Sequence, residues 1–181
     1  MAIWTIDVAH STIQFSVRYL VISTVTGYFT KFDARVETEN DDFENAKISF
    51  FAEINSINTH NEERDKHLKS EDFFFAHNYP RLYFRGTSFQ KIDDKHYKLV
   101  GNLNIRNHTK SISLDVIFGG IITDMQGHKR AGFEITGKIS RKEFGLTWDA
   151  VTETGGIMVG DEIRLNINAQ FKKVTAAIYS H

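Results

Sequence analysis

Two histidines, His60 and His67, stand in the charged stretch INTHNEERDKHLKSEDFF, which runs from Ile57 to Phe74. In a helix, seven residues separate their Cα atoms by about 10.5 Å along the axis. Helical metal pairs use spacings of three or four residues, because both ring nitrogens must reach one ion at about 2 Å. The residue between the two histidines on that face is Arg64, a cation. The spacing therefore argues against a metal site in this stretch.

The same stretch brings together groups that can carry acid–base chemistry. Arg64, His67 and Leu68 share one helical face, and Asp65 is adjacent. A histidine beside an arginine and an aspartate can act as a general acid or base, or can bind an anionic head group. In the alternative interpretation, Arg64 and Asp65 anchor the helix by ion pairs while Leu68 and the Phe73–Phe74 pair pack inward. We favour this alternative, because short charge-rich helices usually face solvent.

Local signals predict that this stretch is a helix. Thr59 followed by Glu62 forms the capping-box pattern T-x-x-E. The residues after Thr59, HNEERDKHLK, contain good helix formers and no helix breaker. We expect one short helix over about 59–69, in a chain that otherwise follows the rhythm of β-strands.

The rest of the chain offers no catalytic constellation. The other histidines are scattered over predicted turns and strand ends without metal-ligand spacing: His10, His77, His96, His108, His128 and His181. No serine lies in a G-x-S-x-G context, and no glycine-rich loop is placed to hold phosphate. The chain has no cysteine, which excludes disulfides and thiolate chemistry. We therefore predict no catalytic residue, no metal and no enzyme activity.

Alternation of apolar and polar residues dominates the remaining sequence, and it predicts about eight strands. The windows are STIQFSVRYL, YFTKFDARVE, AKISFFAEI, RLYFRG, HYKLVGNLNI, SISLDVIF, RAGFEITGKI and EIRLNINAQF. Each window has one apolar face, which is typical of antiparallel strands with one dry and one wet side. The chain is therefore predicted to be all-β.

A single sheet that is apolar on one face must either curl into a barrel or split into a sandwich. Gly86, Gly101 and Gly137 fall on the apolar phase of their strands, where a missing side chain allows sharp coiling or leaves interior room. Several windows are also longer than typical sandwich strands. We predict one domain over residues 1–181, built as an eight-stranded antiparallel barrel with the short helix near an opening.

Charge and hydropathy exclude two classes of partner. The chain has 181 residues and a formal net charge of −1, so we expect neither nucleic acid nor an anionic membrane surface as a partner. No window contains the roughly 18 apolar residues of a membrane-spanning helix. The N-terminal MAIWTIDVAHS lacks the pattern of a signal peptide, so the expected compartment is the cytoplasm, or the periplasm if a leader has been trimmed.

The aromatic content bears on what fills the barrel. The chain has 15 Phe, 6 Tyr and 2 Trp, which indicates a large apolar interior. An eight-stranded barrel is wide enough for packed side chains or for one small or slender ligand. Alternation alone leaves the filled and the hollow interior open.

The charged stretch and its neighbours resemble the YceI-like family of polyisoprenoid-binding, lipocalin-like proteins. The likeness begins with WTIDVAHSTIQFSV, VISTVTGYF and NTHNEERDKHLKSEDFF, and continues with YPRLYFRGTSF and GNLNIRNHTKSISLDVIF. It ends with RAGFEITGKISRKEFGLTW and TGGIMVGDEIRLNI. The segments keep their order over nearly the whole chain. There are local departures, such as Tyr19 where a histidine is common and Phe75 where an aspartate is frequent, and these leave the bound head group open.

The resemblance implies an extended barrel with a hollow apolar pore for an isoprenoid or another long lipid. It also implies a homodimer and a link to stress in bacteria, and no cofactor beyond a bound isoprenoid, quinone or fatty-acid-like lipid. We expect the polar end of the ligand near Arg64, Asp65 and His67. The predicted pore residues are Ile13, Phe15, Val17, Phe32, Phe50, Phe84, Leu103, Ile105, Leu114, Val116, Phe133 and Ile135.

Two alternatives to a lipid carrier remain at this point. One is an isomerase or hydrolase that acts on a lipid-like substrate through His67 and Asp65 in the same pore. The other is a structural or interaction protein whose barrel is filled by its own side chains.

Overall fold

β-strands make up most of the computed structural model, which describes residues 1–20, 22–149 and 159–174. The strands are β1 (Ala2–Ile6), β2 (Thr12–Tyr19), β3 (Ser23–Phe29), β4 (Phe32–Thr38), β5 (Lys47–Glu53), β6 (Ile57–Asn58), β7 (Arg81–Lys91), β8 (His96–Ile105), β9 (His108–Thr123), β10 (Lys129–Ser140) and β11 (Val159–Lys173). One α-helix, α1 (Glu62–Lys69), and three 3-10 turns, η1 (Val8–His10), η2 (Ile54–Ser56) and η3 (Arg141–Phe144), complete the described part.

The strands form one antiparallel sheet that closes on itself. In the described residues, the order β1-β4-β5-β7-β8-β9-β10-β11 returns to β1 through a β1–β11 pairing, which makes a closed barrel of eight strands. The predicted eight-stranded antiparallel barrel is confirmed. Closure removes the sheet edges that would otherwise expose unpaired backbone groups along this ring.

β11 serves as the seam of the barrel. One side of it pairs with β10 from Glu162 to Lys172. Its other side pairs first with β2 and then, after β2 has diverged, with β1 at Phe171–Lys173. β2 continues the wall through β3 to the two-residue β6. The two N-terminal strands β1 and β2 therefore pair with different parts of the same edge of β11.

All eight strand windows taken from alternation are strands in the structure, β2, β4, β5 and β7 to β11. Three further strands, β1, β3 and β6, are missed by alternation. β1 is buried at three successive residues, Ala2–Trp4, and β3 is half-buried along much of its length, so neither shows a clean period of two. Of the TGGIMVGDEIRLNI segment, residues 154–158 lie outside the described residues.

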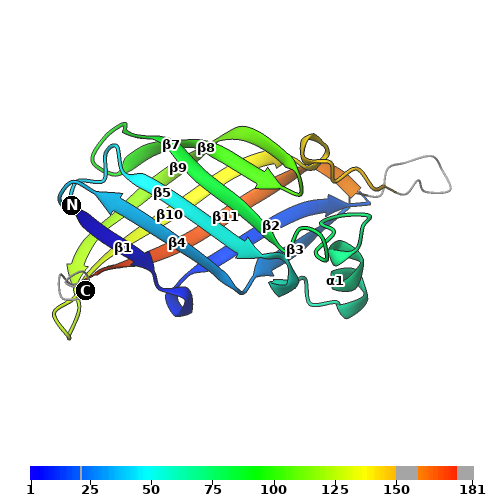
Figure 1. Cartoon of the computed structure of the whole chain (residues 1–181), viewed down its shortest axis with the longest axis horizontal. Helices are drawn as coiled ribbons and strands as arrows, with labels where there is room; N and C mark the ends of the chain where they lie inside the picture. The colour runs from blue at the N-terminus through cyan, green and yellow to red at the C-terminus, as the bar shows by residue number, and fades with distance from the viewer. Residues whose placement is uncertain (21, 150–158, 175–181) are drawn as a thin grey trace.

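The two ends of the barrel differ, as Figure 1 shows. The N-terminus lies at one end, here called the termini end, and α1 lies at the opposite end, here called the helix end. At the termini end, Phe43 from the β4–β5 loop inserts its ring among Trp4, Phe118 and Phe133, with centroid distances of 5.1 to 5.4 Å. Trp4 is fully buried and Phe43 is 1% exposed. This aromatic plug fills the termini end.

α1 begins later and with a different cap than the sequence suggests. Its N-cap is Asn61, whose side-chain oxygen accepts a hydrogen bond from the amide of Arg64. The predicted Thr59–Glu62 capping box is wrong, because Thr59 is turned away to bond Asp65. His60, between Thr59 and the cap, takes a left-handed backbone conformation with φ of 61°. In the described residues, no helix is long and apolar enough to cross a membrane.

Candidate functional site

A cavity of about 140 Å³ lies inside the barrel, between the aromatic plug and the helix end. Every lining residue is apolar except Gln14. The lining residues are Ile6, Ile13, Gln14, Phe15, Phe29, Ala34, Ile48, Phe50, Leu82, Phe84, Leu99, Leu103, Ile112, Leu114, Ile135, Leu165, Ile167, Ala169 and Phe171. An apolar lining of this kind gives water few hydrogen-bond partners and favours apolar ligands. We call this cavity the lumen.

Three of the lumen side chains lie against glycines of the barrel wall. A Cβ at Gly27 would overlap the ring of Phe15, with both Cε atoms only 2.9 Å away. A Cβ at Gly101 would meet the ring of Phe84, and one at Gly137 would meet Leu114. The missing side chains therefore provide room, as expected, but the neighbouring side chains occupy it. Because these groups lie over glycine backbone, they pack close to the barrel wall.

The structure separates the twelve predicted pore residues into two groups. Seven line the lumen: Ile13, Phe15, Phe50, Phe84, Leu103, Leu114 and Ile135. Five do not border it: Val17, Phe32, Ile105, Val116 and Phe133. Phe133 belongs to the aromatic plug, and Val116 pairs with Tyr97 beside it. A role in ligand binding stays a prediction for all twelve.

Several residues that line the lumen are not among the twelve predicted pore residues. Ile6 and Phe29 come from β1 and β3, which alternation missed. Others, such as Ile48, Leu165 and Phe171, stand on the correctly predicted inward phase of their strands. The alternation of apolar and polar residues shows which side chains face the barrel interior, but it does not show where along the barrel axis each of them lies. It therefore cannot separate lumen residues from plug residues.

At the helix end, a line of aromatic rings leads from the segment after α1 into the lumen. The ring of Phe74 contacts the edge of Phe29 at a centroid distance of 6.1 Å, and Phe29 contacts Phe15 at 5.5 Å. Leu68 and Phe74 are partly buried against the core. Leu68, Phe73 and Phe74 pack inward, as predicted by the interpretation in which the charged stretch is an anchored helix and not a catalytic site. This segment forms the cover of the lumen at the helix end.

Arg64 and Asp65 anchor α1 through Thr59. The Nε of Arg64 donates to the Thr59 hydroxyl over 2.8 Å, and its Nη2 donates to the Thr59 carbonyl over 2.7 Å. The Asp65 carboxylate accepts a hydrogen bond from the Thr59 amide over 2.9 Å. The anchor thus consists of hydrogen bonds, where ion pairs were expected. These contacts favour the structural role, and head-group binding by Arg64, Asp65 and His67 stays a prediction.

His67 lies beside a different carboxylate than the enzyme hypothesis requires. Its Nε2 is 2.8 Å from Oδ2 of Asp72, whereas Asp65 is engaged by Thr59. The His67 ring packs edge-on against Trp148 at a centroid distance of 4.5 Å and against Phe73 at 5.2 Å. The structure therefore does not bring His67 and Asp65 together as an acid–base pair.

Arg141, which no sequence motif singles out, holds the loop that carries Trp148. It is 2% exposed, and its Nη1 donates to the carbonyls of Leu146 and Trp148 over 2.6 and 2.8 Å. Its Nε donates to the carbonyl of Gly160 over 2.8 Å. A buried guanidinium is tolerated where its donors are satisfied in this way. Arg141 thereby fixes the aromatic surroundings of His67.

Arg106 ties the β8–β9 turn to the segment after α1. Its Nη1 donates to the carbonyl of Phe73 over 3.2 Å, and its guanidinium lies over the rings of Phe75 and Tyr79. The Nε of Arg106 and the Nδ1 of His108 are buried without a hydrogen-bond partner in the described part of the chain. Buried polar atoms normally find a partner, so these two nitrogens leave hydrogen-bonding capacity at the helix end.

Comparison with known proteins places this architecture in a family. The family model for the YceI-like domain matches residues 4–171. The chain belongs to the YceI-like family. A UPF0312 protein of Staphylococcus aureus strain USA300 is 36% identical over 172 residues, which cover 94% of this chain and 98% of that protein.

Solved structures of YceI-like proteins share the barrel. The Campylobacter jejuni YCEI protein superposes with a TM-score of 0.74 and 34% identity, over 87% of this chain and 90% of that one. A polyisoprenoid-binding domain from Saccharophagus degradans, described as implicated in plant cell wall breakdown, gives a TM-score of 0.68 and 12% identity. That match covers 93% of this chain and 97% of the other, and at this identity it shows the fold alone.

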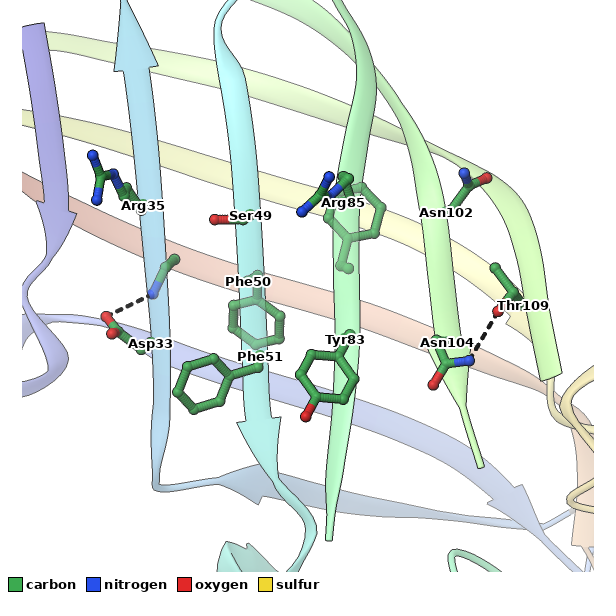
Figure 2. A pocket seen from close by; sticks show the side chains of 12 residues that line it. Asp33, Arg35, Ser49, Phe50, Phe51, Tyr83, Arg85, Asn102, Asn104 and Thr109 are labelled. Atoms are coloured by element: carbon green, nitrogen blue, oxygen red, sulfur yellow. Dashed lines mark hydrogen bonds between the residues drawn. The ribbon is translucent and has the colours of Figure 1, made fainter. Parts of the chain in front are cut away.

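This YceI-like chain also has a hollow on its outer wall, and at about 550 Å³ it is larger than the lumen. Figure 2 shows that two rows of outward side chains run across the strands there. The strand register sets the rows. One row is Arg35, Ser49, Arg85 and Asn102, and the other is Asp33, Phe51, Tyr83 and Asn104.

Metal binding finds no support in the residues that the structure describes. No three His, Cys, Asp or Glu side chains among them gather closely enough to hold an ion. The YceI-like chain presents two candidate sites of different character, the apolar lumen inside the barrel and the hollow on its outer wall, where arginine, amide and aromatic side chains lie together.

Proposed function

We propose that this protein binds a long isoprenoid, or a lipid with a similarly slender apolar chain, in the lumen, and that it does so without converting the ligand. The observation that carries the proposal is the lumen itself, which is apolar at every described lining residue but Gln14. The aromatic plug closes the termini end, so the ligand enters from the helix end. No cofactor is needed for this activity.

Burial of the chain supplies the affinity. Each CH₂ group moved from water into an apolar site contributes about 0.8 kcal/mol, so ten such groups give about 8 kcal/mol before the costs of ordering. The lumen of about 140 Å³ is smaller than the roughly 300–1,000 Å³ typical of ligand pockets. Binding therefore requires that wall-packed side chains shift and that the Phe74 cover moves aside. A slender chain requires a smaller displacement of these side chains than a bulky ligand does.

The polar end of the ligand would remain at the helix end. Nitrogens of Arg106 and His108 that have no hydrogen-bond partner in the described part of the chain lie there, and Arg64 and His67 belong to α1 at the same end. A guanidinium pairs well with phosphate or carboxylate. Family membership supports the lipid class, since a domain with the same fold is described as polyisoprenoid-binding. We also propose a stress-related role and a homodimer, both of which are implied by the family resemblance.

Extraction and reconstitution test the proposal directly. Purified protein is extracted with organic solvent for lipid mass spectrometry, and the intact complex is weighed by native mass spectrometry. Delipidated protein is then offered a C40 isoprenoid alcohol. We expect one bound chain per barrel in at least one of the two measurements. Absence of any long-chain lipid together with no uptake of the isoprenoid contradicts the proposal.

The same samples address the enzyme hypothesis. If incubation with a lipid yields a chemically altered product, and His67→Ala abolishes the product while the lipid still binds, then the barrel is a catalyst. Unchanged lipid in both proteins supports a carrier.

A further inference from the structure

The outer-wall hollow contains a notch between two arginines. Arg35 and Arg85 stand directly across the strands from Ser49, one on each side of it. Two strand spacings put their Cα atoms about 10 Å apart. Ser49 is short, and Figure 2 shows the Arg85 guanidinium on the Ser49 side of β7, whereas the Arg35 guanidinium lies on the side of β4 away from Ser49. An anion above the Ser49 hydroxyl would therefore meet Arg85 directly, and would meet Arg35 once that side chain turns across β4.

These arginines have spare binding capacity. Arg85 is exposed, and it forms no hydrogen bond or ion pair with any other residue that the structure describes. Arg35 pairs with Glu37 over 3.2 Å, and its side chain is 50% exposed, so this bond is readily exchanged. Glu37 lies outside the residues that line the hollow, and Asp33 is the one carboxylate among them. With Glu37 on Arg35 and Asp33 in the lining, the two arginines are balanced by two carboxylates, and Arg85 is the guanidinium that lacks an ionic partner among the described residues.

An aromatic surface lies two residues along the strands from the notch, a distance of about 7 Å. Tyr83 is 50% exposed, and its ring centroid is 6.5 Å from that of Phe51. The guanidinium of Arg81 covers one face of Phe51 at 4.2 Å from the ring centroid, which leaves Tyr83 as the accessible ring. The negative face of such a ring attracts the polarised C–H groups of a sugar.

Polar groups surround this ring. Asn102 and Asn104 lie on one side, and Ser49 and Asp33 lie on the other. Asn104 donates to the hydroxyl of Thr109 over 2.8 Å, which orients its amide. Amides, hydroxyls and one carboxylate are suited to the donors and acceptors of hydroxyl groups.

We propose that this hollow binds an anionic sugar, meaning a pyranose that carries a phosphate, sulfate or carboxylate group. The anion occupies the notch between Arg35 and Arg85, and the ring packs on Tyr83. The spacing of about 7 Å between the two rows matches a charged substituent on a six-membered ring. Arg35, Arg85 and Tyr83 do not line the lumen, so substitution of these residues leaves the lumen lining unchanged.

NMR titration of ¹⁵N-labelled full-length protein at constant ionic strength tests this site. The probe is glucose 1-phosphate, and glucose, inorganic phosphate and AMP are titrated in parallel. We expect saturable shifts confined to amides near residues 33–35, 49–51, 83–85 and 102–104. Glucose and phosphate alone should bind at least about tenfold more weakly, since each supplies half of the contacts.

Substitution at the notch completes the test. Arg85→Gln should weaken glucose 1-phosphate binding at least about tenfold, because it removes charge-assisted hydrogen bonds. Arg164→Gln on β11 serves as the matched control, since Arg164 is an exposed arginine whose partner is Glu162. Uptake of the C40 isoprenoid should be unchanged in both variants, which distinguishes failure of this site from failure of the lumen.

Four results would overturn the proposal. The first is the absence of saturable shifts at the two rows, and the second is an equal loss in Arg85→Gln and Arg164→Gln. If inorganic phosphate binds as tightly as glucose 1-phosphate, the notch is an anion site without sugar recognition. If AMP binds as tightly, the site selects phosphate esters regardless of the sugar. A second titration with glucuronate then shows whether a carboxylate replaces the phosphate.

Discussion

The ring of Phe15 occupies the space that a side chain at position 27 would take, and Leu114 does the same at position 137. Each glycine therefore acts on the lumen through its neighbour. A methyl group added at either position has no room unless the neighbouring side chain turns toward the barrel axis. The width of the lumen is in this way encoded at residues that do not line it.

We predict that Gly27→Ala reduces uptake of the C40 isoprenoid roughly tenfold, which corresponds to the loss of about two buried CH₂ contacts. The prediction rests on lipid binding in the lumen. Gly132→Ala is the control, because a Cβ at Gly132 meets nothing within 4 Å. Binding constants are measured by fluorescence competition. Equal uptake by Gly27→Ala and wild type would show that the Phe15 ring can move without narrowing the lumen.

A second residue-scale prediction concerns acid stability. Arg130 donates to Asp124 over 2.8 Å and the amide of His128 donates over 2.9 Å, and these bonds lower the pKa of Asp124 from 3.8 to about 2. A carboxyl group whose pKa is lower in the folded state stabilises the fold above its unfolded pKa. This stabilisation is therefore present above about pH 4 and is lost as the pH falls toward 2.

Asp124→Asn should lower stability at pH 6 and should also reduce the further loss between pH 4 and 2. Urea midpoints at several pH values, followed by tryptophan fluorescence, measure both effects. Asp7 and Asp41 keep lowered pKa values in the variant, so acid sensitivity decreases without vanishing. An identical pH dependence in variant and wild type would rule out a contribution from Asp124.

At the scale of elements, the strands were more predictable than the site. Eight strands follow from alternation because each has one dry face, and the barrel follows because that face must be covered. Alternation misses β1 because Ile3 and Trp4 are neighbours in the sequence and are both buried, so the strand has no exposed face that would give a period of two. Arg141 was not identified as a key residue, since its role depends on carbonyls brought together only by folding.

The helix cap gives a prediction at this scale. Asn61→Ala removes the bond to the Arg64 amide and should destabilise α1 by about 1 kcal/mol. Because α1 is short and peripheral, we expect this loss to appear as local opening. Hydrogen exchange of the α1 amides should be about fivefold faster, with the global urea midpoint unchanged. Lys66→Ala, at an exposed position of the same helix, should not accelerate exchange. A shift of the global midpoint in Asn61→Ala would mean that α1 unfolds only with the barrel.

At the scale of the whole molecule, the aromatic plug at the termini end makes the two ends of the barrel unequal. Phe43 reaches in from a loop, and its neighbours come from β1, β9 and β10. One side chain therefore links strands on different sides of the barrel. A molecule built in this way is stabilised at one end and left free to open at the other.

Phe43→Ala should destabilise the protein by about 3–5 kcal/mol, the usual range for deleting a buried phenylalanine side chain. Ile92→Ala is the comparison, since Ile92 lies in the β7–β8 turn and is 65% exposed, and its cost should stay below about 0.5 kcal/mol. Chemical denaturation measures both. A cost for Phe43→Ala as small as that for Ile92→Ala would show that the plug contributes packing without contributing stability.

The seam has a consequence for biosynthesis. Trp4 pairs with Lys173, so the barrel cannot close until the end of β11 has left the ribosome. At about 5–20 residues per second, roughly 10–30 seconds pass between the synthesis of these two residues. During that time the growing sheet exposes an apolar face and strand edges to other nascent chains. The protein is thus made as an open sheet and becomes a container only after β11 has been synthesised.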